Sequence, residues 1–285
     1  MKKIILILLF LLQTVLFAQS AVWKIQKEDD VIYLGGTIHL LRSKDYPLPK
    51  EYEMAYKNSH TIYFETNLKK LEDPNLQKEM ISAMVLKKGK KLSTVLSTKT
   101  YNALKKHAQS RGVDILHFEN FKPAMIILTL TVIELKNMGI DAQGVDSFYF
   151  KKALNDNKQL GQLESVESHI NYLSTMGEGN ENNLVIQSLK DLKKSKKYFS
   201  RIISAWKNGS IGALNRLFVT DMKKNTPKLY QSLLVERNNN WMPILESLFG
   251  NEKTEFILVG AAHLVGQHGL LQQLKREGYT VQKYK

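Results

Sequence analysis

The chain of 285 residues contains no cysteine. This absence excludes disulfide frameworks, thiolate zinc sites, CxxC redox pairs and cysteine nucleophiles. H-E-x-x-H, G-x-S-x-G and Walker motifs are also missing, so an ordinary zincin, an α/β-hydrolase or a nucleotide-binding protein has no support. There is no low-complexity tract and no linker rich in proline, glycine or serine. We therefore expect a single folded domain with little disorder.

Acidic residues are too few to balance the basic ones. Lys+Arg number 41 against Asp+Glu 27, which gives a formal net charge of +14. The excess is mostly lysine in short runs at 86–91, 192–199 and 222–225, a pattern typical of solvated helix faces. No arginine-rich stripe or ladder of aromatic residues accompanies these runs. We expect no nucleic-acid partner, and only a weak attraction to anionic membrane surfaces or acidic polymers.

The N-terminus carries the pattern of a secretory signal peptide. Residues 1–20, MKKIILILLFLLQTVLFAQS, have two lysines, an apolar run and a small-residue exit, and cleavage after Ala18 or after Ser20 fits the pattern. An uncleaved membrane anchor is the weaker alternative, because the run is short for a bilayer span. The sequence thus predicts a mature domain at 21–285, in the bacterial periplasm or secreted. The apolar stretch 124–135 is shorter still and predicts a buried helix.

Strand patterns lie at both ends of the chain, and helical patterns fill its middle. Capping residues, prolines and glycines mark the helices, with Gly89 expected to end the helix that starts at Pro74. The class is α/β, with one mixed sheet built from N- and C-terminal strands and a large helical middle region. Strands are expected within 21–36 (a hairpin), 60–67, 158–165, 254–263 and 279–285, and helices at 49–58, 73–89, 97–112, 123–138, 144–157 and 268–278, with three or four more over 166–249.

Two distant segments share one motif. LGGTIHLL (34–41) and LVGAAHLV (258–265) each run an apolar strand into Gly-x-x-His. Ligands of α/β sheets collect beyond the carboxyl ends of the strands, so the pair predicts that His39 and His263 point toward one place. A single Gly-x-x-His is more typical of a structural histidine. The duplication is what favours a functional site.

A third strand exit, FETN, places Glu65 at its tip. Two histidines and one carboxylate are a ligand set for zinc, manganese, iron or cobalt, with positions left for water and substrate. Such a metal supports hydrolytic chemistry. Glu65 is then either the third ligand or the general base for the attacking water, and the alternative to both is an ordinary surface carboxylate.

Other residues are candidates for supporting roles. Arg237 and Asn238 share a predicted helix with Trp241; the arginine either holds negative charge on a substrate or forms a structural salt bridge beside a core tryptophan. Asp146 either orients a ligating imidazole or caps the helix that follows it. His268 either lines the site or faces solvent. The remaining histidines fit no common spacing: His60, His107, His117 and His169.

These segments, taken in order, resemble the TraB/PrgY/GumN family, which is related to the TIKI metalloproteases. The resemblance runs over essentially the whole mature chain. It implies a mixed α/β fold akin to erythromycin-esterase-like and ChaN-like proteins, and a divalent-metal-dependent protease. It rests on the stretches VWKI, YLGGTIHLL, YFETN, GVDSF, GQLESVE, ERNNNWMP and LVGAAHLVGQHGLLQQLKREGYTV.

Carried over by position, the resemblance implies His39, His263 and Glu65 as metal-site residues, with Arg237 and Asn238 beside them. It implicates manganese or cobalt, and the donor set also admits zinc. Many relatives have an aspartate two residues after the glutamate; this chain has an asparagine there, which removes a negative charge near the site.

The expected function is an exported metal-dependent hydrolase, first of all a peptidase, acting on a peptide or small-molecule substrate. One alternative is a protein that sequesters a peptide or pheromone without turnover, which the resemblance to PrgY suggests. Another is a metal or haem carrier resembling ChaN. The sequence specifies no oligomeric state.

Overall fold

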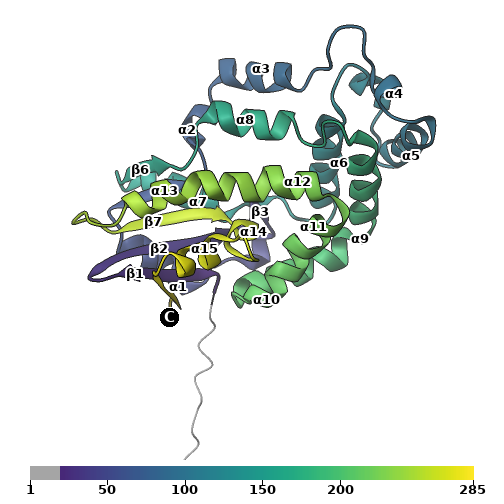
Figure 1. The fold of residues 1–285 in the computed structure, drawn as a ribbon. Helices are drawn as coiled ribbons and strands as arrows, with labels where there is room; N and C mark the ends of the chain where they lie inside the picture. The colour runs from purple at the N-terminus through teal and green to yellow at the C-terminus, as the bar shows by residue number, and fades with distance from the viewer. Residues whose placement is uncertain (1–19) are drawn as a thin grey trace, which may run out of the picture.

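The computed structural model describes residues 20–285 and shows a sheet with helices around it (Figure 1). Apart from Ser20, the predicted signal peptide lies outside the described residues. Six strands form one sheet in the order β6-β4-β7-β2-β1-β8. Their bounds are β1 Val22–Lys27, β2 Asp30–Thr37, β4 Thr61–Phe64, β6 Gln159–Gln162, β7 Glu255–Gly260 and β8 Thr280–Lys283.

The middle of the sheet is parallel and one side of it is antiparallel. β7 runs parallel to β2 and to β4, and β4 runs parallel to β6. β1 pairs antiparallel with β2 and with β8. The mixed α/β sheet assembled from both chain ends is therefore confirmed. Because β2, β4, β6 and β7 run in one direction, their carboxyl ends meet at one edge of the sheet.

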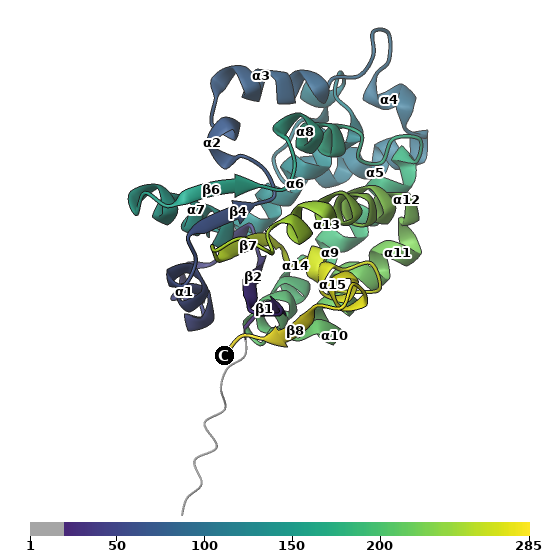
Figure 2. The ribbon, with the colours of Figure 1, turned by 60° about the vertical axis from the view of Figure 1, so that its left-hand side comes forward.

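Helices cover both faces of the sheet. Figure 2 shows α1 (Lys50–Lys57) on one side, and α13 (Arg237–Ser247) with α15 (Leu270–Arg276) on the other. α7 (Val145–Asn155) packs on the same face as α1, because Tyr52 of α1 and Tyr149 of α7 both contact the ring of Phe256 in β7. Successive side chains of β7 point alternately into two apolar layers, which bury the strand up to its last residue.

The helical middle lies beyond one end of the sheet (Figure 1). α4, α5, α6 and α9 pack around a second apolar cluster that includes Leu104, Ile126 and Val185. The expected buried helix over 124–135 is part of α6, whose Ile126 and Leu130 are fully buried. The bounds are α2 Leu68–Leu71, α3 Pro74–Ala83, α4 Leu92–Val95, α5 Thr98–Gln109, α6 Pro123–Asn137, α8 Val166–Ser174 and α9 Glu181–Lys207.

One helix ends earlier than the sequence indicates. α3 begins at Pro74 with Asp73 as its cap, as predicted, but it stops at Ala83 rather than near Gly89. The next residues pair with a distant segment: Val85 bridges Phe121, and the Leu86 N–H donates to the Asn120 carbonyl at 2.8 Å. This pairing overrides the helical pattern between 84 and 89.

Four continuous helical stretches fill 166–249, in agreement with the three or four predicted. The last two contain π-helical segments, in which each backbone hydrogen bond spans one residue more than in an α-helix. η3 (Asn215–Thr220) joins α10 (Ile211–Leu214) to α11 (Asp221–Asn225), and η4 (Gln231–Glu236) joins α12 (Pro227–Tyr230) to α13. π-helical turns are frequent at functional sites, and η4 ends immediately before Arg237.

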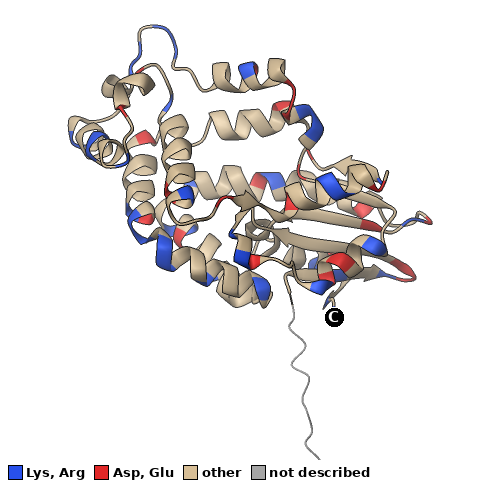
Figure 3. Cartoon of the chain, turned by 180° about the vertical axis from the view of Figure 1, so that it is seen from behind, with Lys and Arg blue, Asp and Glu red and all other residues tan. Residues whose placement is uncertain are grey.

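The surface charge is spread rather than concentrated. On the side seen in Figure 3, basic positions lie on many helices and strands with acidic positions between them. Within the described residues, no helix is both long and apolar enough to cross a bilayer.

Candidate functional site

Each of the four parallel strands is followed, just beyond its carboxyl end, by one polar side chain. His39 comes two residues after β2, Glu65 directly after β4, Glu164 two residues after β6, and His263 three residues after β7. Three of them, His39, Glu65 and His263, line one cavity of about 420 Å³. The parallel register of the sheet therefore brings together side chains that are more than two hundred residues apart.

Gly260, the last residue of β7, lies at the centre of the predicted set. A Cβ atom on Gly260 would lie 3.2 Å from Glu65 Oε1, 3.6 Å from His263 Cδ2 and 4.0 Å from His39 Nε2. Its N–H donates to Glu65 Oε1 at 2.6 Å, and that oxygen lies 4.0 Å from His263 Nε2. The two histidines and the glutamate thus surround one point, where a Cβ would crowd the Glu65 carboxylate.

A buried hydrogen-bond network holds the end of β2. The carbonyl of Gly36 accepts from the Tyr52 hydroxyl at 2.5 Å and from Trp206 Nε1 at 2.7 Å. Both aromatic side chains are fully buried. These two hydrogen bonds restrain the Gly36 backbone, from which the loop that carries His39 begins.

The GVDSF segment holds His39 itself. Its Nδ1 bonds Asp146 Oδ2 at 3.0 Å, which turns Nε2 toward the cavity. Asp146 lies in the first turn of α7, but the cap residue of that helix is Gly144, with no side-chain cap bond. Of the two roles considered for Asp146, orienting an imidazole is therefore the one the structure shows. Gly144 is required here, because a Cβ would lie 2.3 Å from the His39 carbonyl carbon.

The charges around His39 favour its protonated form in the absence of a metal. The side chain is 68% exposed at the cavity. Desolvation by the surrounding protein lowers its pKa, but the Asp146 carboxylate and, more weakly, Glu65 outweigh that effect and raise the pKa to about 9. A cation that binds Nε2 must therefore displace a proton.

Asn238 fixes the second histidine. Its Oδ1 lies 2.7 Å from His263 Nδ1, and its Nδ2 donates to the carbonyls of His263 and His268 at 3.0 and 2.7 Å. The acceptor at Nδ1 places the proton there and makes Nε2 the acceptor nitrogen of the ring. Burial lowers the pKa of His263 to about 3, so the ring is neutral.

Arg237 connects the site residues. Its Nη2 donates to Glu65 Oε2 at 2.6 Å and to Glu164 Oε1 at 2.8 Å, and its Nε donates to Glu164 Oε2 at 3.0 Å. Nη1 lies 3.1 Å from His263 Nε2. The guanidinium carbon lies 4.7 Å from the Trp241 ring centroid. Arg237 is thus a buried partner of two carboxylates, bidentate to Glu164 and with one hydrogen bond to Glu65.

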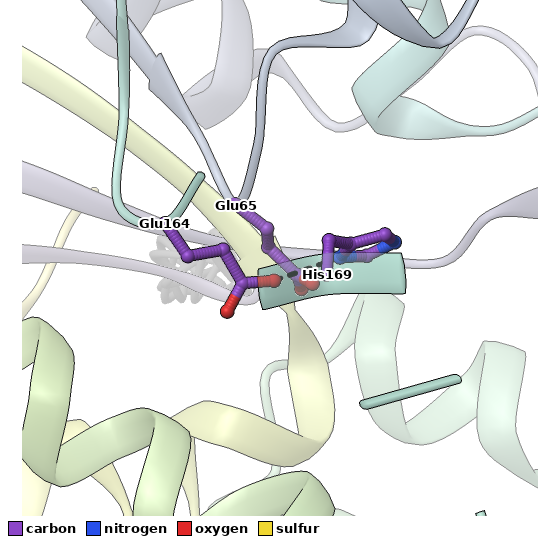
Figure 4. Close-up of side chains that lie close together, drawn as sticks. All are labelled: Glu65, Glu164 and His169. Atoms are coloured by element: carbon purple, nitrogen blue, oxygen red, sulfur yellow. Dashed lines mark hydrogen bonds and ion pairs between the residues drawn. The ribbon is translucent and has the colours of Figure 1, made fainter. Parts of the chain in front are cut away.

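Glu164 and His169 are site residues that the sequence reasoning missed. Figure 4 shows Glu65 and Glu164 with their carboxylates close together and His169 beside them. These three have ligand atoms within 4.8 Å of one another and could hold a metal ion. Glu164 follows a predicted strand exit, as Glu65 does, so that signal was available. His169 had none, because its role depends on a contact of 2.7 Å with Glu164.

Two other predicted residues have local roles. The His268 ring packs on Tyr230, with centroids 6.3 Å apart, and does not line the cavity. Asn67, at the position where many relatives have aspartate, caps α2 by accepting from the Lys70 N–H at 3.1 Å. An aspartate would cap the helix equally well, so the departure leaves this turn intact.

The fold and the side chains at the carboxyl ends of its parallel strands define an α/β protein with a polar pocket lined by three histidines, Glu65, Asp146 and Arg237. The chain belongs to the TraB/PrgY/gumN family, which matches residues 21–283, and the predicted family is confirmed.

Curated relatives carry the name metalloprotease. Metalloprotease TIKI2 of Danio rerio is 25% identical over 306 residues, 88% of this chain and 58% of the relative. Metalloprotease TIKI1 is 24% identical in Xenopus tropicalis and in Homo sapiens, each time over 92% of this chain and 61% of the relative. The chain thus spans about three fifths of the length of these relatives. No solved structure matches it.

Proposed function

We propose that the protein is an exported metal-dependent hydrolase that cleaves peptides. The observation that carries the proposal is the meeting of His39, Glu65 and His263 around Gly260, at the wall of a cavity large enough for a substrate. The metalloprotease names of the relatives support the same reaction class.

The donor chemistry of His39, Glu65 and His263 suits a divalent transition metal, and among the described residues the group with donor atoms all within 4.8 Å of one another is Glu65, Glu164 and His169. His39 and His263 would present Nε2, and each has its Nδ1 held by an oxygen acceptor, as metal-ligating histidines do. Glu65 would complete the set, and manganese, cobalt and zinc all accept such ligands. When bound, the metal polarises a carbonyl group and acidifies water.

We assign Glu65 to the ligand role rather than to the general base. Burial alone would raise its pKa, but the positive charges around it, Arg237 and His39 among them, hold the pKa well below its usual range. A carboxylate stabilised in this way is a weak base at neutral pH. Its ionised form is the one that a cation requires.

His169 is the residue we assign to proton transfer. It lines the same cavity, and its Nδ1 lies 2.7 Å from Glu164 Oε1. If Nδ1 carries the proton, Nε2 is left with a lone pair that takes a proton from the attacking water and returns it to the leaving amine. Glu164 therefore positions two groups, the His169 imidazole as the base and the Arg237 guanidinium.

Arg237 would stabilise the negative charge that develops on the substrate. The two carboxylates and the Trp241 ring fix its guanidinium in place, so little reorganisation is needed during the reaction. Nη1, which bonds His263 Nε2 in this structure, is the donor that would turn to the substrate when a metal takes that nitrogen.

Metal analysis combined with peptide cleavage tests the proposal. The purified protein would be loaded with manganese, cobalt or zinc, desalted and analysed by mass spectrometry of the metal, and then assayed on a peptide library with and without chelator. We expect one tightly bound metal and cleavage that the chelator abolishes. His39→Ala and His263→Ala should each lose both properties.

His117→Ala is the matched control, since His117 is exposed in the helical middle. It should keep the metal and the activity. A protein that retains no metal under any loading condition contradicts the mechanism. Tight peptide binding without chelator-sensitive cleavage would favour sequestration instead.

Export is part of the proposal and rests on the signal-like pattern of residues 1–20. Fractionation of bacteria that express the full chain should place it in the periplasm or the medium, shortened at its N-terminus. Recovery of the uncleaved chain from the cytoplasm would contradict this part.

A further inference from the structure

One part of the cavity wall is apolar. It is formed by side chains from α2, α8, α11 and η4: Leu68, Leu71, Leu173, Met222, Leu233 and Leu234. Five of the six are partly exposed, and Leu234 is buried. Partly exposed leucines that converge on one concave surface from four helical segments form a surface that an apolar ligand group can bury.

Charged groups around the cavity are already paired. Arg237 bonds Glu65 and Glu164, Asp146 bonds His39, and His169 bonds Glu164. Most of the charge at the cavity is therefore paired within the protein, while Asp146 Oδ1 is buried without a hydrogen-bond partner among the described residues. Burying an uncompensated charge against this wall is costly, whereas burying an apolar side chain there is favourable.

The apolar wall is continuous with the proposed reaction centre. His39, Glu65 and His263 line the same cavity as the leucines. Leu68 and Leu71 follow Glu65 in the chain within α2, and Leu233 and Leu234 precede Arg237 in η4. A substrate whose reacting bond lies at the polar site can therefore place a neighbouring apolar side chain against these leucines.

We propose that this cavity is a specificity pocket and that the substrate is a peptide with a large apolar side chain, such as leucine, methionine or phenylalanine, flanking the bond that is cleaved. This inference rests on the proposed peptidase function. It goes beyond that function by stating which peptides are cleaved.

The test is a set of peptides that differ at one position only. The metal-loaded protein would be assayed on peptides with Leu, Phe, Ala, Asp or Lys beside the cleaved bond. We expect kcat/KM for Leu and Phe to exceed that for Ala by roughly 10-fold or more, and that for Asp and Lys by a larger factor. Equal rates across the set would overturn the proposal.

Variants of the wall connect the preference to this cavity. Leu173→Asp should reduce the ratio of Leu to Lys cleavage by about 10-fold or more, because the new carboxylate pairs with lysine and repels the apolar group. Leu71→Asp, at the end of the four-residue α2, is a second variant in case the first does not fold. Leu116→Asp is the control, since Leu116 is 63% exposed and does not line the cavity.

A binding measurement separates failure of the pocket from failure of the peptidase. Calorimetry on the metal-free protein would compare blocked Leu, Phe, Asp and Lys dipeptides, which need no cleavage. The pocket is supported, even if no peptide is cleaved, when only the Leu and Phe dipeptides bind. That binding should be lost in Leu173→Asp or Leu71→Asp and kept in Leu116→Asp. Binding that ignores the side chain, or that survives both wall variants, overturns it.

Discussion

Removing the Asn238 side chain tests how the site is held. Asn238 is 1% exposed and makes three hydrogen bonds, one with His263 Nδ1 and two with the carbonyls of His263 and His268. Asn238→Ala leaves all three groups without these partners. Each such buried loss costs about 1–3 kcal/mol, so we expect the free energy of unfolding to fall by about 3 kcal/mol or more.

The same substitution should weaken metal binding. Without the acceptor at Nδ1, the His263 ring is no longer held with Nε2 toward the cavity. Loss of such an outer partner typically lowers metal affinity by about 10- to 100-fold. Urea denaturation would measure the stability, and calorimetric titration with manganese, cobalt and zinc would measure the affinity.

Asn240→Ala provides the control, because Asn240 lies on the same helix but is exposed, with one bond of 3.2 Å to the Tyr172 hydroxyl. It should change stability by no more than about 0.5 kcal/mol and leave the metal affinity unchanged. If Asn238→Ala and Asn240→Ala behave alike in both assays, the network around His263 does not hold the site as described.

Three further variants probe other contacts. Gly144→Ala forces a Cβ into the His39 backbone and should lower both the urea midpoint and the metal affinity; unchanged values would refute the close approach. Glu164→Gln weakens the anchoring of Arg237 and should keep the metal while kcat falls about 10-fold or more; an unchanged kcat would refute the anchoring. Burial lowers the pKa of His107 below 6.5, so the unfolded chain binds that proton first and stability falls as the pH drops below about 6.5. His107→Leu should flatten this loss in unfolding curves from pH 8 to 5, and an identical slope would refute the assignment.

The sequence predicted the sheet because its strands carry strong signals. Both Gly-x-x-His segments are apolar runs with glycines at their ends, and in a parallel sheet the carboxyl ends of such runs meet at one edge. The repeated motif therefore predicts that His39 and His263 lie in one region. The order β4-β7-β2 then explains why Glu65 lies with them.

The contacts between side chains were harder to predict. Arg237 was expected to be either a substrate contact or part of a salt bridge. It forms the salt bridge in this structure, to Glu65 and Glu164 together. That geometry depends on how α13 lies against the exits of β4 and β6, which periodicity along the chain does not encode. His169 was not predicted as a site residue for the same reason, since its role depends on a contact with Glu164 and not on a pattern along the chain.

Local signals also failed where a tertiary contact competed with them. The pattern that continues α3 toward Gly89 is genuine, yet the bridge between Val85 and Phe121 ends the helix first. The two π-helical segments had no distinct sequence signature. One of them places Leu233 and Leu234 on the cavity wall just before Arg237, so an irregularity invisible to the sequence shapes the pocket.

The two carboxylates at this edge share one internal cation, and this determines where a metal can bind. Four hydrogen bonds, two from Arg237 and one each from His169 and Trp241, already satisfy Glu164, so Glu164 is occupied as long as the arginine is in place. Arg237→Met would leave two carboxylates with ligand atoms within 4.8 Å of each other and no cation between them. Breaking a buried pair costs about 3–5 kcal/mol, and we expect a divalent metal to recover part of that loss by binding in the position of the guanidinium. The variant should therefore melt well below the wild type without metal and show the larger increase in melting temperature when manganese is added. Equal increases in both proteins would mean that Arg237 does not occupy a cation position.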